Sequence, residues 1–171
     1  MKQTKISVLL ASLMAAGFML SGQAMAADAT ASASATIVTP IAISKTTDMS
    51  FGGVLATAGA GTVVLATNND RTAVGVTLVD AATGTAAEFL VQGQPGYTYA
   101  ITLPASTSLT GTGAAMTVDE FTSNPGTTGT LAASGDNAGK QDLLVGATLN
   151  VGETQAAGTY TGTFSVTVAY N

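Results

Sequence analysis

Polar and apolar residues alternate with a period of two along much of this sequence, a pattern that favours β-strands. The clearest case is the last strand signal, in which one alternating set is mostly aromatic or branched and the other is mostly hydroxylic. The first set is Tyr160, Gly162, Phe164, Val166, Val168 and Tyr170, and the second is Thr161, Thr163, Ser165, Thr167 and Ala169. A period of two places the two sets on opposite faces, so the segment predicts a long, half-buried strand.

Ten segments carry a strand signal, and no window shows a convincing helical period. They are Thr30–Val38, Ile41–Lys45, Met49–Phe51, Thr62–Ala66, Thr72–Val79, Ala87–Gln92, Thr98–Leu103, Met116–Thr122, Leu143–Val151 and Thr159–Tyr170. Short strands at this spacing predict an all-β sandwich, with a closed barrel as the alternative. Two stretches rich in Gly, Ser and Thr, Pro104–Ala115 and Ser123–Lys140, are expected to be long loops or hairpins with weak strands.

The first 26 residues have the pattern of a cleaved secretory signal peptide. Lys2 and Lys5 precede an uncharged apolar run from Ile6 to Leu20, and an A-x-A motif ends at Ala26. The run is shorter than the roughly 20 residues that a membrane-spanning helix needs, which disfavours a membrane anchor. We therefore expect export through the periplasm to the cell surface, a fimbrium or an extracellular matrix, with no membrane span after cleavage.

A second alternating segment opens the mature chain, and its residues are small. One face is Ala29, Ala31, Ala33, Ala35 and Ile37, and the other is Thr30, Ser32, Ser34, Thr36 and Val38. Such a strand has so little apolar area that it must pair with an existing sheet edge, in its own domain or in another copy. We accordingly divide the mature chain into residues 27–39, an N-terminal extension or first strand, and residues 40–171, the β-sandwich domain.

The composition removes most catalytic and metal chemistry. With Cys 0, His 0 and Trp 0, the chain has no thiolate nucleophile, no imidazole base, no His or Cys metal site and no indole platform for a sugar. Asp+Glu 10 against Lys+Arg 5 gives a formal net charge of −5. An acidic chain with few basic residues is a poor partner for nucleic acid. We expect no enzyme activity, no cofactor and no nucleic-acid partner.

Two chemical possibilities stay open at this level. Residues 68–70 (Asn-Asn-Asp) and 136–137 (Asp-Asn) carry oxygens that could bind calcium, although both are also ordinary turn sequences. The calcium-loop pattern of alternating Asp and Asn before a Gly is missing. Lys45 or Lys140 could form an isopeptide bond with an Asn, and no motif supports it.

The last residues carry a resemblance to a known class. Residues 158–171 (GTYTGTFSVTVAYN) resemble the C-terminal strand of bacterial chaperone–usher pilins and of spore-coat-U-type secreted domains. Those pilin strands have a Gly fourteenth from the end and a Tyr next to last, and Gly158 and Tyr170 hold these places. The mature chain, including residues 39–43 (TPIAI) and 50–52 (SFG), also resembles a family of small secreted bacterial domains of unknown function.

The pilin resemblance implies an immunoglobulin-like fold completed by a strand from a neighbouring subunit. The donor strand would present Ala29, Ala31, Ala33, Ala35 and Ile37, and the acceptor groove would be lined by Gly158, Tyr160, Phe164, Val166, Val168 and Tyr170. Two features depart from the pilin pattern, since the usual disulfide is missing and the donor residues are mostly Ala. The resemblance also implies a periplasmic chaperone and an outer-membrane assembly protein as partners.

These observations predict a structural subunit of a bacterial surface filament or biofilm-matrix fibre, which polymerises with its own copies by donor-strand-type β-augmentation. Strands rich in Thr and Gly, with few Lys residues, guard poorly against edge pairing, and this suits a chain that polymerises. The alternative is a monomeric secreted adhesin or carbohydrate-binding β-sandwich module that uses exposed aromatics, for which Tyr97 and Tyr99 are the candidates. We expect that pair to serve core or cross-strand packing instead.

Overall fold

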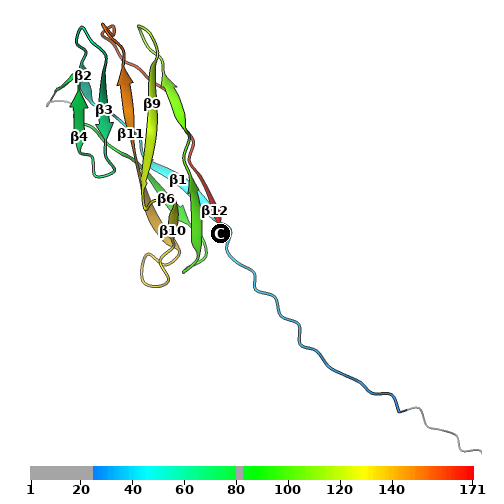
Figure 1. The fold of residues 1–171 in the computed structure, drawn as a ribbon. Coiled ribbons are helices and arrows are strands. Elements are labelled where there is room, and N and C mark those ends of the chain that lie inside the picture. Colours follow the sequence, from blue (N-terminus) through cyan, green and yellow to red (C-terminus); the bar gives the residue numbers. More distant parts are fainter. Residues whose placement is uncertain (1–24, 80–82) are drawn as a thin grey trace, which may run out of the picture. The chain divides into compact units, whose positions relative to one another are not determined.

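A computed structural model describes residues 25–79 and 83–171 (Figure 1). Over these residues the chain is all-β, with twelve strands and no helix, and no part of it forms a helix suited to crossing a membrane. The expected signal peptide lies outside the described residues except for Met25 and Ala26. The chain divides into two units, residues 1–36 and residues 37–171.

The described part of the first unit, residues 25–36, contains no strand, and all of its residues are exposed. The strand signal at Thr30–Val38 therefore does not produce a strand in the single chain, and Ile37 is 95% exposed. An extended segment obtains backbone hydrogen bonds only from a neighbouring strand, and alanines bury too little apolar area to replace them. The alternating segment thus has the sequence pattern of a strand but no neighbouring strand to pair with in the single chain.

The larger sheet of the second unit is built around β11 (Lys140–Val151), which is paired along both edges. One edge pairs with β6 (Ala87–Gln92) in its first half and with β3 (Gly61–Leu65) in its second half. The other edge pairs with β9 (Met116–Asn124). Three further strands extend this sheet outward: β1 (Ala42–Thr47) beyond β6, β4 (Arg71–Val74) beyond β3, and β8 (Ser106–Leu109) beyond β9.

Two smaller sheets complete the second unit. One has the order β10 (Thr128–Thr130), β7 (Thr98–Thr102) and β12 (Thr167–Tyr170), and the other pairs β2 (Gly53–Leu55) with β5 (Thr77–Val79). Only residues 103–105 separate β7 from β8, so one stretch of chain contributes to two sheets. In Figure 1, β2, β3 and β4 lie toward one end of the unit, and β1, β6, β10 and β12 lie toward the other.

The core consists of two clusters, and β11 contributes to both. Leu143 and Val145 pack with Tyr99 of β7 in one cluster, so the three-stranded sheet packs on the larger sheet there. Leu149 belongs to the other cluster. Between the two lies Gly146, where a Cβ would collide with the main chain of residues 65–67. This glycine lets the end of β3 approach β11 closely.

The structure agrees best with the sequence where strands are paired along both edges. The bounds of β6 are those predicted, and β11 and β9 extend beyond the predicted segments. The predicted strand Thr72–Val79 is broken at Gly75, whose φ of 77° turns the chain between β4 and β5. The two stretches expected to be loops or weak hairpins contain the short strands β8 and β10.

The predicted last strand, Thr159–Tyr170, is the main correction. Regular ladder pairing is limited to β12, and residues 158–166 contribute a single isolated bridge. The alternation is nevertheless present, because Tyr160, Phe164, Val166 and the two inward-facing residues of β12 are half-buried between exposed neighbours. The segment therefore has the predicted half-buried and exposed faces, but it lacks a partner strand along one edge.

Candidate strand-binding groove

Residues 155–164, which we call the C-terminal wall, follow β8 along one edge only. Thr161 and Thr110 exchange two backbone hydrogen bonds of 2.9 Å each. The Thr107 hydroxyl donates to the carbonyl oxygen of Thr163 at 2.7 Å. Thr161 and Thr163 therefore direct their backbone carbonyls toward β8.

The opposite edge of the C-terminal wall is unpaired. In an extended chain the backbone groups of successive residues point to opposite sides, so those of Tyr160, Gly162 and Phe164 point away from β8. Within the described residues these groups have no backbone hydrogen bond. The backbone N–H and the backbone carbonyl of each of these residues therefore remain available to an added strand.

A second segment lines the groove opposite the first. We call residues 45–56 the N-terminal wall; it comprises the end of β1, a bridge between Ser50 and Thr85, and β2. Among the described strands, β1 is the outermost of its sheet and pairs only with β6. The guanidinium of Arg71 donates to the carbonyl oxygen of Phe51 at 2.7 Å and so fixes the corner between β1 and β2.

A groove of about 870 Å³ lies between the two walls. Its remaining lining is largely apolar and comes from four strands: Ala87 and Phe89 of β6, Leu109 of β8, Met116 and Val118 of β9, and Leu149 and Val151 of β11. The charged lining residues are Lys45 and Asp48, which form a salt bridge with each other on the exposed rim. An extended chain with one apolar face has the chemistry that such a groove accepts.

Aromatic side chains hold the C-terminal wall in place. The ring of Phe164 meets Phe89 edge-on with centroids 6.3 Å apart, and lies tilted on Phe121 at 5.0 Å. At the other end of the wall the hydroxyl of Tyr160 donates to the carbonyl oxygen of Ala156 at 2.9 Å. Edge-to-face contacts of this kind add about 0.5–1.5 kcal/mol each beyond area burial.

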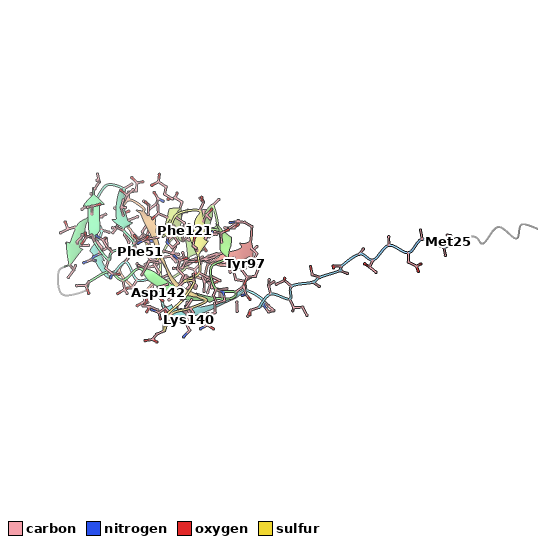
Figure 2. All side chains as sticks on the ribbon, turned by 90° about the horizontal axis from the view of Figure 1, so that it is seen from below. Met25, Phe51, Tyr97, Phe121, Lys140 and Asp142 are labelled. Atoms are coloured by element: carbon pink, nitrogen blue, oxygen red, sulfur yellow. The ribbon has the colours of Figure 1, made fainter. Side chains whose placement is uncertain are left out.

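The groove is closed at one end, where β1 and β12 contact each other. The hydroxyl of Tyr170 donates to the carbonyl oxygen of Thr39 at 2.7 Å and accepts from the backbone N–H of Gln94 at 2.6 Å. Thr39 in turn donates its N–H to the side-chain oxygen of Gln94 at 3.1 Å. In Figure 2, Phe51 of the N-terminal wall and Tyr97, which packs on Tyr170, are well separated along the unit.

The predicted acceptor residues fall into two groups. Gly158, Tyr160 and Phe164 line the groove. Val166, Val168 and Tyr170 do not line it and pack instead on the core cluster around Leu143. The N-terminal wall and the floor were not predicted from the sequence, because which strands flank an unpaired edge is decided by tertiary packing. The SFG segment at residues 50–52, which lies in the N-terminal wall, was noted only as part of the family resemblance.

The other candidate sites are the Asn- and Asp-rich turns and the pair Tyr97 and Tyr99. Residues 68–70 form a self-bonded turn, in which Asn68 donates to the carboxylate of Asp70 at 2.6 Å. Over the described part of the chain, no three potential metal-ligating carboxylates come together. Tyr99 is fully buried, and Tyr97, 43% exposed, packs edge-on against Tyr170, so both serve packing as predicted. Burial raises the pKa of the Tyr99 hydroxyl, which lies 2.9 Å from the side-chain oxygen of Gln141.

Comparison with known families matches residues 41–170 to a family described as a domain of unknown function, DUF4402. The match covers most of the chain, and the protein belongs to this family. A search of curated proteins and of solved structures found no significant match.

Proposed function

We propose that this protein is an exported structural subunit of a bacterial surface filament or biofilm-matrix fibre, and that its subunits join by β-augmentation. The observation that carries the proposal is the groove of about 870 Å³, which lies over an apolar floor between two strand edges. In this proposal the second unit is an immunoglobulin-like sandwich that lacks one edge strand. Its role is structural and requires no catalytic residue or cofactor.

The proposed occupant is the N-terminal extension of a second copy. Residues 28–38 alternate with the period that a groove-filling strand requires, and residues 25–37 are exposed in the single chain. Their alanine face and Ile37 would lie on the floor, while the Ser and Thr face would remain in water. The backbone would bond to Tyr160, Gly162 and Phe164 of the C-terminal wall.

Because the donor residues are small, which departs from the pilin pattern, most of the binding free energy of the donor strand would come from backbone hydrogen bonds. A strand inserted between two free edges gains a ladder on each side, each bond contributing about 0.5–1.5 kcal/mol net. Ile37 is the large apolar side chain of the donor face, and its full burial contributes about 1.5–3 kcal/mol. We therefore expect Ile37 to be the anchor of the donor.

The alternative, a monomeric secreted adhesin or carbohydrate-binding module, has weaker support. Its candidate platform was the pair Tyr97 and Tyr99, and Tyr99 is fully buried in the core. A groove with free strand edges can also bind an extended peptide from another protein. The two proposals differ in what a purified chain does alone.

Negative-stain electron microscopy of the mature chain tests the proposal. Filaments are expected from the full-length protein and not from a variant that lacks residues 28–37. Ile37→Asp, which would bury a charge in the groove, should abolish filaments, whereas the matched Thr36→Asp, on the opposite face of the donor, should retain them. Monodisperse particles from the folded full-length chain, or filaments from the deletion variant, would contradict the proposal.

A further inference from the structure

We infer that Tyr170 directs strand exchange between copies by keeping the extension of each chain out of its own groove. The inference rests on the proposed function and adds a device that regulates which extension fills the groove. The device is a set of contacts at the closed end, formed by Thr39, Gly93, Gln94, Tyr97 and Tyr170, which we call the Tyr170 socket.

The socket fixes the point at which the extension leaves the second unit. Both backbone polar groups of Thr39 are bound, the N–H to the side chain of Gln94 and the carbonyl to the Tyr170 hydroxyl. A Cβ at position 93 would collide with that hydroxyl, so Gly93 is required for the ring to reach its place. Pro40 follows directly, and a residue before proline is held to extended conformations.

The socket also closes the route into the chain's own groove. β1 begins at Ala42, just after the socket, and β12 ends at Tyr170 within it, so the two strands contact each other there. A strand inserted between β1 and β12 would require them to lie about 9.6 Å apart, twice the usual spacing of neighbouring strands, whereas their Cα atoms approach within 8 Å. The chain's own extension starts at this sealed end, whereas the groove lies between the walls at residues 45–56 and 155–164.

Such a barrier is needed on physical grounds. A tethered segment has an effective concentration of about millimolar toward a site on its own chain. At micromolar protein concentration, an extension free to enter its own groove would outcompete the extension of a second copy by about a thousandfold. A fibre subunit with a flexible extension therefore requires either a geometric block or a partner that occupies the groove, and the socket supplies a block within the chain.

Peptide binding tests the inference. A synthetic peptide of residues 27–38 is titrated into the full-length protein and into the variant lacking residues 28–37, at concentrations below assembly. With the native socket, both proteins should bind the peptide with equal affinity, within about twofold. With Tyr170→Phe, the full-length protein should bind it at least tenfold more weakly than its own deletion variant, because the tethered extension now competes.

Two further variants make the result specific. Gly93→Ala displaces the same ring by a different route and should reproduce the effect of Tyr170→Phe. Gly126→Ala is the matched control for Gly93→Ala, since it lies outside the socket and a Cβ at position 126 would meet no atom within 4 Å, and it should behave as the native protein. Circular dichroism and the melting temperature establish that each variant is folded.

The outcomes separate this inference from the function on which it rests. Equal peptide affinity for the full-length and deletion forms of both Tyr170→Phe and Gly93→Ala would overturn the role of the socket and leave the fibre proposal intact. Weaker binding by the native full-length protein than by its deletion variant would also overturn it. A folded deletion variant that does not bind the peptide at all would contradict the donor-strand proposal itself.

Discussion

β11 and the C-terminal stretch from Gly158 to Tyr170 make an instructive pair, because both are long, strand-forming segments with opposite outcomes. β11 is paired along both edges over most of its length and supplies buried residues to both core clusters. The C-terminal stretch is paired along one edge, and its regular ladder is limited to the four residues of β12. A period-two pattern thus determines which face is buried, while a partner on each edge determines whether a regular ladder forms.

β11 and the C-terminal stretch also differ in how much apolar area they bury. Leu143 and Val145 of β11 are fully buried, whereas Tyr160 and Phe164 of the C-terminal wall are only half-buried and therefore still have apolar area to lose to a partner. Each 100 Å² of apolar area removed from water contributes about 2.5 kcal/mol. The C-terminal wall is therefore the region in which an added strand stabilises the molecule most.

The largest effect on the free energy of unfolding is expected when a side chain of β11 or of the C-terminal wall is truncated to alanine. Leu143→Ala should lower the free energy of unfolding by about 2–5 kcal/mol, since the side chain is fully enclosed. Phe164→Ala, in the variant lacking residues 28–37, should lower it by clearly less than the about 3–5 kcal/mol typical of a buried Phe. Urea denaturation of the two variants gives both values. A loss for Phe164→Ala as large as that for Leu143→Ala would show that the groove is already filled.

Assembly should give the C-terminal stretch the second strand partner that β11 already has, and so should stabilise the folded state. The melting temperature of the full-length protein is expected to rise with protein concentration, because binding at 100 times Kd adds about 2.7 kcal/mol to the folded state. For a domain of this size that is an increase of about 5–10 °C. Calorimetry at several concentrations measures it, and the deletion variant, which has no donor, should show a constant value.

The corner of the N-terminal wall offers a smaller test. Arg71→Met retains most of the side-chain length and removes the hydrogen bond to the carbonyl oxygen of Phe51. We expect a loss of about 1–2 kcal/mol in unfolding free energy and weaker binding of the peptide of residues 27–38. Arg71→Lys, which retains the charge, should recover part of the affinity. Unchanged affinity in Arg71→Met would mean that the groove does not depend on this contact.

The smallest expected effect is on the pH dependence of the unfolding free energy, through the buried Tyr99 of β7. Burial raises the pKa of Tyr99 above its ordinary value of 10.0, so the folded state holds this proton more tightly than the unfolded state. Its contribution to stability is therefore complete below pH 10 and is lost as the pH rises from the unfolded pKa through the folded one. Tyr99→Phe should show a shallower decline of unfolding free energy between pH 9 and pH 11, measured by urea denaturation. Identical slopes would contradict this.

The sequence predicted those features that depend on local pattern. The all-β class, the bounds of β6 and the alternating burial of the last strand follow from periods and turn residues that the chain itself displays. The N-terminal wall, the floor and the Tyr170 socket were not predicted, because they unite residues such as Thr39, Gln94 and Tyr170 from distant parts of the chain. Periodicity shows that a residue faces inward, and it carries no information about which strand lies beside it.

The most direct test of the account is amide hydrogen exchange along the C-terminal wall. NMR of the variant lacking residues 28–37 should show fast exchange at Tyr160, Gly162 and Phe164, and protection at Thr161, whose amide is bonded to β8. Adding the peptide of residues 27–38 should slow exchange at the first three by at least a hundredfold and leave Thr161 little changed. Peptide binding without added protection at those three amides would contradict strand insertion into the groove.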